Sequence, residues 1–406
     1  MYNIPNNCSG YDDMALDFQQ IRSQIRELGE KAPIIERRLR ERREEARKVL
    51  ESEAGELGHL RQKVELVVRQ YNPSLRCAVP VNEPLDARIP APPALGQATI
   101  IAADGSQIYP DRHAEVNYCL INVGAINMIH GSAASPDVHV SSQLFYDQGL
   151  STGGELTVAT VALRRDLYER EMLAKLAIAA PSPVITFTDG PMELWGARDP
   201  AIASEFQKSL GDYIDVLEQL RAGGVITAGY VDKPAANLVV RLLEVALLAE
   251  SELTEINKKH PLNGVMDSAL YREMLQPGER SAVFELQSQS AAYYRDDLAL
   301  HFFYLNVGRP RRPSLARVDL PAWVARSPKM LDELHAALVS QCRIMGARPY
   351  PYLLHRAHEA AVVSLQEKEQ LAQMIALDLR RRGVSVGERS NKQTAKDLSG
   401  KKRYER

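Results

Sequence analysis

The chain lacks the features that mark several classes of protein. Only four of its 406 residues are cysteine, and none has the C-x-x-C spacing of a zinc knuckle, so we expect reduced thiols and no disulfide framework. No run approaches the roughly 18 apolar residues that span a bilayer, and the N-terminus shows no basic stretch followed by an apolar one. We therefore expect a soluble, cytoplasmic protein without a membrane segment.

A strong excess of either charge is also missing, because the formal net charge is only −2. Basic residues nevertheless collect in residues 309–313, in residues 380–382 and in the last twenty residues. Local basic patches matter more than the overall balance when the partner is a polyanion. Taken alone, each patch is more simply explained as solvated surface or tail.

The N-terminal part is predicted to be helical and highly charged over residues 11–71. A narrow apolar seam runs along it, formed by Phe18, Ile21, Ile25 and Leu28. Pro33 interrupts this pattern, which favours a bent helix or a helical hairpin. Such an arm either docks a partner or a second copy, or packs along its own domain, and the sequence leaves both interpretations open.

Proline content suggests where the core begins. Residues 72–96 contain six prolines and show little periodicity, which predicts a linker on the surface. We divide the chain into a helical arm with this linker (residues 1–84), a folded core (residues 85–383) and a flexible basic tail (residues 384–406). The tail has too few apolar residues to fold by itself.

Within the core, strand patterns come first and then alternate with helix patterns. Strands are predicted at residues 98–104, 116–123, 138–146, 183–189, 224–230, 281–286, 301–307 and 317–323. Helices are predicted at residues 156–179, 201–221, 235–252, 329–345 and 352–382. The first two strands form an antiparallel pair joined by a polar loop. This order predicts an α/β fold built on a mixed sheet.

An Asp-Gly dipeptide occurs twice, each time after a short β-prone apolar run. Asp104 precedes Gly105, and Asp189 precedes Gly190. A buried strand delivers its last residue to the edge of a sheet, where glycine allows a sharp turn and a carboxylate can face a cleft. If the two strands lie close together, the two carboxylates come within reach of one hard cation or a cation pair.

A third acidic side chain is expected from the helix at residues 156–179. Glu171 lies four residues after Leu167 and therefore on the apolar stripe, whereas Glu169 points more toward solvent. A carboxylate on a buried face is costly unless it is paired or bound to metal, so Glu171 is the better candidate ligand. The alternative is a buried pair of Glu171 with Arg164 or Arg165.

Three further residues are candidates of lower specificity. His358 shares a helical stripe with apolar residues, where a histidine is usually a satisfied core residue. Tyr350 precedes that helix and could meet His358 across its first turns, contacting a phosphate or capping the core. Lys233 follows a strand and suits a phosphate oxygen, although an ordinary loop lysine is the simpler interpretation.

Together these residues resemble the pattern of the NurA family of nucleases. The resemblance covers about residues 95–370 and includes the late segment RVDLPAW at residues 317–323. It implies an RNase H-like fold, a homodimer, and a manganese-dependent nuclease that degrades single-stranded DNA and duplex ends with 5′ to 3′ polarity. It also implies work beside a HerA-type hexameric helicase in DNA end resection and double-strand break repair.

Carried over residue by residue, the resemblance implies metal ligands at Asp104, Glu171 and Asp189, with Glu169 as the alternative helix glutamate. His358 becomes a further ligand or general acid, Tyr350 an active-site residue, and Lys233 a loosely matched lysine. Two cations about 4 Å apart would serve such chemistry. Carboxylates suit Mg²⁺ or Mn²⁺, and an imidazole ligand favours Mn²⁺.

For DNA binding we expect phosphate contacts from residues 309–312 and aromatic platforms such as Tyr293, Tyr294 or Trp195. Two rival functions stay open. One is a phosphatase with Asp104 as nucleophile, although position 106, where such enzymes have a second aspartate, is Ser106. The other is a catalytically inactive dimeric adaptor for a hexameric ATPase.

Overall fold

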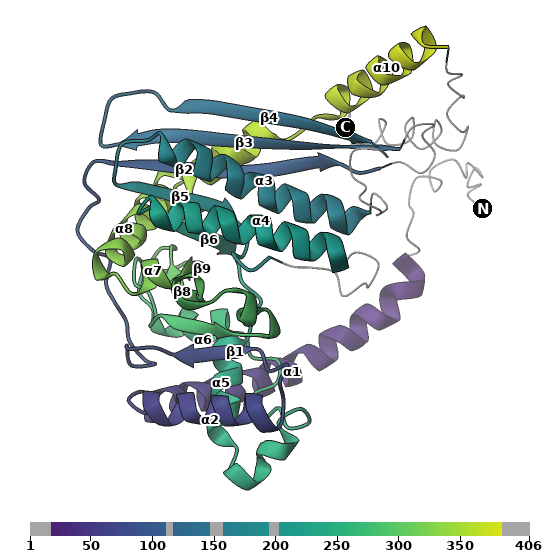
Figure 1. Cartoon of the computed structure of the whole chain (residues 1–406). Coiled ribbons are helices and arrows are strands. Elements are labelled where there is room, and N and C mark those ends of the chain that lie inside the picture. Colours follow the sequence, from purple (N-terminus) through teal and green to yellow (C-terminus); the bar gives the residue numbers. More distant parts are fainter. Residues whose placement is uncertain (1–17, 111–116, 147–156, 195–202, 384–406) are drawn as a thin grey trace, which may run out of the picture.

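A computed structural model of the chain describes residues 18–110, 117–146, 157–194 and 203–383. Its centre is one mixed sheet (Figure 1). In order across the sheet, the strands are β1 (Cys77–Pro80), β7 (Phe284–Gln287), β8 (Leu300–Asn306), β9 (Leu315–Pro321), β6 (Ile226–Asp232), β5 (Val184–Asp189), β2 (Ala98–Ile108), β3 (Tyr118–His130) and β4 (Asp137–Tyr146). Strands β2, β5 and β6 run parallel to one another, and the other pairs of neighbours are antiparallel.

Helices cover both faces of this sheet. On one face α3 (Val158–Ile178) packs on β2 and β3 and against α4 (Ala203–Ala222), while α8 (Pro328–Ile344) and α9 (Tyr352–Ala361) cover the other (Figure 1). Successive residues of a strand point to opposite faces, so β2 contributes alternately to two separate apolar cores. A sheet buried on both faces explains why the central strands are continuous apolar runs. The mixed sheet flanked by helices confirms the predicted fold class.

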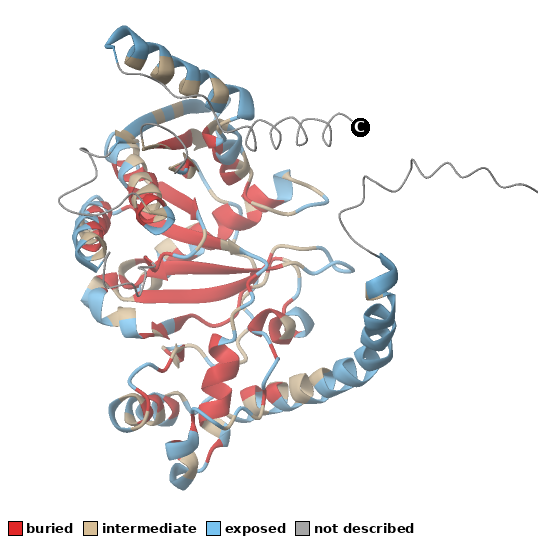
Figure 2. Cartoon of the chain, turned by 90° about the vertical axis from the view of Figure 1, so that its right-hand side faces the viewer, coloured by how far each residue is buried: buried red, intermediate tan, exposed pale blue. Residues whose placement is uncertain are grey.

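The N-terminal helix α1 (Phe18–Ser52) is continuous through Pro33, so the helix does not end there. Pro33 lies in the exposed part, where water can satisfy the carbonyl that loses its backbone partner. The chain instead turns after α1 and continues as α2 (Leu57–Gln70). Only the C-terminal part of α1 is buried, through Ala46 and Leu50, and the rest projects from the body as an exposed arm (Figure 2).

The proline-rich segment at residues 72–96 is more ordered than expected. It contains β1, which forms the edge of the sheet beside β7. Glu83 then anchors the segment, because its carboxylate accepts bonds of 2.8 Å from two nitrogens of the buried Arg280. The sheet therefore begins before residue 85, while the division of the chain into three domains stays a prediction.

The remaining elements follow the predicted order, except that two short helices were not predicted and one predicted helix is divided in two. The other α-helices are α5 (Leu238–Leu247), α6 (Asp267–Met274), α7 (Ala322–Ala325) and α10 (Leu365–Arg381), and 3₁₀ turns lie at Glu250–Glu255, Gln289–Tyr293 and Asp296–Leu298. The helix predicted at residues 352–382 is divided into α9 and α10, because Ser364 caps a new helix with Glu367. In the part of the chain that the structure describes, no helix is long and apolar enough to cross a membrane. The basic tail and Trp195 lie outside that part.

Candidate active site

Asp104 and Asp189 come from neighbouring parallel strands. Ala103 of β2 is in register with Thr188 of β5, so the next residue of each strand is an aspartate. Both side chains follow Ala102 and Phe187 by two positions and point to the face that α9 covers. The structure thus places these two carboxylates side by side, as the repeated Asp-Gly dipeptide predicted.

The two glycines of the dipeptides have different roles. At Gly190 β5 has ended and φ is +89°, a backbone conformation that favours glycine. At Gly105, by contrast, β2 continues to Ile108, so the expected turn is absent. A Cβ on residue 105 would lie 2.6 Å from Cγ of Arg165 and 2.7 Å from Oε1 of Glu169. Gly105 is therefore needed because α3 packs its side chains directly against the strand.

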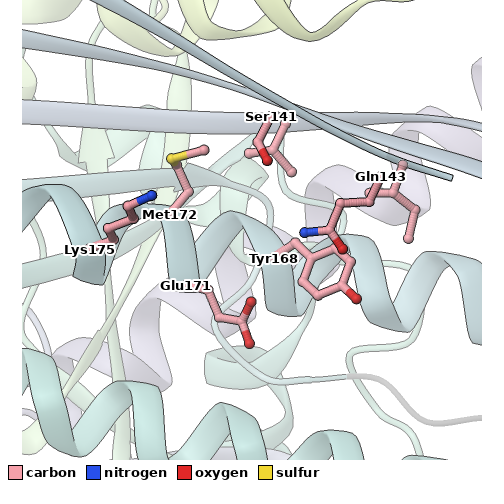
Figure 3. Close-up of a pocket in the computed structure, with 8 residues that line it drawn as sticks. Ser141, Gln143, Tyr168, Glu171, Met172 and Lys175 are labelled. Atoms are coloured by element: carbon pink, nitrogen blue, oxygen red, sulfur yellow. The ribbon is translucent and has the colours of Figure 1, made fainter.

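Glu169, and not Glu171, is buried against β2 at this place, so the prediction that Glu169 points toward solvent is wrong, while the choice of ligand stays a prediction. Glu169 is 5% exposed, and its pKa is raised by burial and by the nearby Asp166 and Asp104, against the lowering effect of Arg165. Glu171 lies in a separate pocket between α3 and strands β3 and β4, with Tyr168, Lys175 and Ser141 (Figure 3). Burial and Asp212 of α4 raise the pKa of Glu171. The acidic neighbour of Glu171 is therefore Asp212, and not Asp104 or Asp166 as for Glu169.

The sequence pattern could not distinguish these two glutamates. Helix α3 packs against the sheet and against α4, so its buried arc is wide and includes polar residues such as Arg170. Glu169 lies within this arc, whereas Glu171 is exposed. Only the packing decides that the Glu169 side meets Gly105 of β2.

His358 of α9 binds the strand aspartate directly. Its Nδ1 lies 2.6 Å from Oδ2 of Asp104, whose Oδ1 accepts a 2.8 Å bond from the backbone N–H of Gly105. Helix α9 approaches the sheet closely because Gly124 of β3 has no side chain; a Cβ there would lie 2.6 Å from the backbone nitrogen of Ala361. The His358 side chain is 62% exposed, so it is not a core histidine but a group at the surface of the site.

Tyr350 contacts Asp189 and not His358. Its hydroxyl hydrogen-bonds the Asp189 carboxylate, and its ring packs edge-on against Tyr230 with 5.5 Å between centroids. The pKa of Asp189 is raised by burial, with Asp104 and Asp232 raising it further, although the hydrogen bond from Tyr350 opposes the shift. Burial and the same carboxylates also raise the pKa of Tyr350. Tyr350 thus fixes one of the two strand aspartates.

Asp232 is a further acidic residue at this edge, and the sequence reasoning passed over it. It ends β6 two residues after Tyr230, the residue of that strand that is in register with Asp189. The sequence does mark Asp232, since it follows a third β-prone run and immediately precedes Lys233. Lys233 itself has φ of +45° and a side chain that is 84% exposed, with Nζ 3.9 Å from Asp232. It stands at the same edge, as predicted, and its ammonium faces solvent.

The carboxylate oxygens at this edge of the sheet are of the type that binds hard divalent cations. Carboxylates of Asp104, Asp189 and Glu169 would offer oxygen ligands to such an ion, and positive charge would relieve their mutual repulsion. In the described residues, however, no three or more His, Cys, Asp or Glu side chains are already grouped as a metal site. The carboxylates are engaged by cationic or polar neighbours instead, Asp104 by His358 and Glu169 by Arg165 at 3.3 Å.

Of the aromatic platforms predicted for DNA, Tyr293 is 43% exposed, whereas Tyr294 is buried. The Tyr294 hydroxyl accepts a 2.8 Å bond from the backbone N–H of Leu194, so the residue supports the fold. The basic residues 309–312 form the turn between β8 and β9. That turn lies at the same edge of the sheet as Asp232, because Ala316, near the start of β9, is in register with Asp232.

The arrangement agrees with a known family. The family model for the NurA domain matches residues 98–363, a span that contains Asp104, Glu169, Asp189, Tyr350 and His358. The chain belongs to the NurA family. This membership supports a nuclease, and no curated protein matches the chain.

Three solved structures resemble the NurA chain only weakly. Drosophila Piwi is 14% identical with a TM-score of 0.29, and the match covers 67% of this chain but 30% of Piwi. Endonuclease V from Ciona intestinalis is 9% identical with a TM-score of 0.32, covering 71% of this chain and 92% of the other. The human endonuclease V catalytic domain is 14% identical with a TM-score of 0.30, covering 70% and 85%. These low scores add nothing to the assignment of the site.

Proposed function

We propose that this NurA protein is a metal-dependent deoxyribonuclease that hydrolyses phosphodiester bonds at the edge of the sheet where β2, β5 and β6 end. The observation that carries the proposal is the convergence of Asp104 and Asp189, on adjacent strands, with Glu169 from α3. These acidic groups, far apart in the sequence, lie near one another at this edge of the sheet, although in the described residues they do not form a preformed metal site.

Asp104, Glu169 and Asp189 would hold the divalent cations, and His358 would act either as a further ligand, which favours Mn²⁺ over Mg²⁺, or as the general acid. Two bound cations would supply an activated water and neutralise charge on the phosphoryl oxygens. The chain's own side chains then orient the site. Tyr350 holds Asp189 through its hydroxyl, and His358 places an exposed imidazole beside Asp104, where it can deliver a proton to the leaving oxygen.

The DNA backbone would be bound by the basic turn between β8 and β9. Arg309, Arg311 and Arg312 are exposed on this turn, at the same edge of the sheet as Asp232. Lys233 adds a fourth positive charge beside the carboxylates. Such contacts bind phosphates without reading bases, so the affinity would be sensitive to salt and tolerant of sequence.

The family resemblance extends the proposal to the biological context. We propose that the protein acts as a homodimer with a HerA-type hexameric helicase, cutting single strands and degrading duplex ends from 5′ to 3′ during double-strand break repair. Large apolar side chains that are exposed on β4 and α10, such as Val138, Leu144 and Met374, are consistent with protein partners.

The test is to incubate the purified full-length protein with 5′- and 3′-labelled single-stranded and duplex DNA in Mn²⁺, in Mg²⁺ and in chelator. We expect nucleotide release with Mn²⁺, less with Mg²⁺ and none in chelator. Asp104→Asn and Asp189→Asn should each lower the rate about a hundredfold or more. The matched control Asp212→Asn, on α4, should retain the activity.

The rival functions predict different outcomes. An adaptor would release no nucleotides under any condition but would still associate with a hexameric ATPase. A phosphatase would hydrolyse p-nitrophenyl phosphate and leave internal phosphodiester bonds intact. If Asp104→Asn or Asp189→Asn kept more than half of the nuclease rate, the catalytic assignment would be wrong.

A further inference from the structure

Arg165 of α3 lies between the strand and helix carboxylates. Its Nε is 3.3 Å from Oε1 of Glu169, its Nη2 donates to Oδ1 of Asp166 at 2.7 Å, and its Nη1 donates to Oε1 of Gln107 on β2 at 3.1 Å. Its Cγ lies 2.6 Å from the point where a Cβ on Gly105 would stand. Contacts with both α3 and β2 thus fix the guanidinium at the place where Glu169 meets the strand.

The charges around Arg165 are mostly negative. Asp166, Glu169 and Asp104 together raise the pKa of Arg165 although its burial opposes the shift. The nearby Arg170 is 2% exposed and donates to Oγ1 of Thr227, so its guanidinium is bound inside the fold. Arg165 is 29% exposed and is the guanidinium that directly contacts Glu169 in the described structure.

We propose that Arg165 is an internal counter-ion, which holds Glu169 against Gly105 when no divalent cation is bound and competes with the cation for that carboxylate. This inference rests on the proposed metal-dependent function and goes beyond it. Glu169 is only 6% exposed at its side chain, so leaving its charge without a partner would be costly. Arg165 therefore stabilises the metal-free protein and weakens the attraction of the site for a second positive charge.

Two consequences distinguish a counter-ion from an ordinary packing residue. Removing the charge of Arg165 should destabilise the metal-free protein more than the metal-bound protein, because a bound cation can take over the same role. It should also tighten cation binding about five- to tenfold, since one repulsive charge a few ångströms away is lost. A packing residue would lower the stability equally in both states.

The experiment measures cation binding without turnover. The wild-type full-length protein, Arg165→Gln and Arg165→Met are titrated with Mg²⁺ by calorimetry at one pH, and their melting temperatures are measured in chelator and in saturating Mg²⁺. Arg165→Met keeps the aliphatic packing on Gly105 in case the glutamine variant does not fold. Arg164→Gln is the matched control, because Arg164 is the preceding residue of α3 and pairs with Glu205 of α4.

We expect both Arg165 variants to bind Mg²⁺ more tightly than the wild type and to gain more in melting temperature when it is added. The melting temperature of Arg164→Gln should be lower than that of the wild type by the same amount in chelator and in Mg²⁺. Unchanged or weaker Mg²⁺ binding by the Arg165 variants would overturn the proposal that Arg165 is a counter-ion. If the wild type itself neither binds Mg²⁺ or Mn²⁺ nor is stabilised by them, the proposed metal-dependent function fails, which is a separate and recognisable result.

Discussion

Oε1 of Glu169 lies 2.7 Å from the point where a Cβ on residue 105 would stand, so Gly105 and Glu169 share one space between β2 and α3. This contact brings a carboxylate from one face of the sheet to the strand that carries Asp104. The glycine of the first Asp-Gly dipeptide therefore lets the Glu169 side chain approach the strand and does not form a turn. That relationship makes the position of Glu169 sensitive to a single methyl group.

Gly105→Ala should displace Glu169 and Arg165 while the strand itself remains. We expect the Mn²⁺-dependent nuclease rate to fall about tenfold or more, because a carboxylate that is misplaced by about 1 Å costs much of its effect. Gly211→Ala is the matched control, since a Cβ there meets no neighbour and alanine favours a helix. The rates of purified variants on labelled DNA check this, and more than half of the wild-type rate in Gly105→Ala would contradict it.

Glu169→Gln and Glu171→Gln form a second matched pair on α3. Glu169→Gln should lower the nuclease rate about a hundredfold, because it removes a charged group beside Asp104. Glu171→Gln should stay within about threefold, since Glu171 faces the pocket of Figure 3 and Asp212. The reverse pattern would restore Glu171 as the functional residue.

Replacing Arg309, Arg311 and Arg312 with glutamine should weaken the binding of single-stranded DNA and its dependence on salt. Each lost phosphate contact lowers the slope of log K against log salt by about 0.7, so the slope should decrease by up to about 2. Fluorescence anisotropy between about 50 and 200 mM NaCl measures it. A control that removes three charges from α1 and α2, Lys48→Gln with Arg61→Gln and Arg69→Gln, should leave the slope unchanged. Equal slopes for both triple variants would contradict the assignment.

His335 of α8 should make the protein less stable in mild acid. It is fully buried, Nε2 donates to the carbonyl of Gly278 at 2.8 Å, and burial lowers its pKa from 6.5 to about 4. Because the unfolded chain takes up this proton more readily, stability is complete above pH 6.5 and is lost as the pH falls toward 4. Between pH 7 and 5 the loss is about 2 kcal/mol.

The variant His335→Gln isolates that contribution. Its amide can still donate to the carbonyl of Gly278 but does not titrate in this range. We expect its melting temperature to fall less than that of the wild type when the pH is lowered from 7 to 5. An identical decrease in both proteins would show that His335 does not cause the acid sensitivity.

The order of strands and helices in the core could be predicted because it depends on local patterns. Apolar runs of strand length and helical periodicity gave the order of the strands from β2 to β9 and of helices α3, α4, α5, α8 and α9, and they placed Asp104 and Asp189 on strands, whereas α6 and α7 were not predicted. The split between α9 and α10 was missed, although Ser364 and Glu367 carry the capping signal. The strand β1 was missed because its segment is rich in proline.

By itself, then, the sequence determined the fold class, the family pattern and the two strand aspartates, since each is written in short-range spacing. The tertiary structure alone decided that Glu169, rather than Glu171, is buried beside β2, that His358 binds Asp104 and that Tyr350 binds Asp189. Those choices depend on how α3 and α9 pack on the two faces of the sheet, through Gly105 and Gly124. Residue spacing along one helix cannot fix which side of a broad buried arc meets a distant strand.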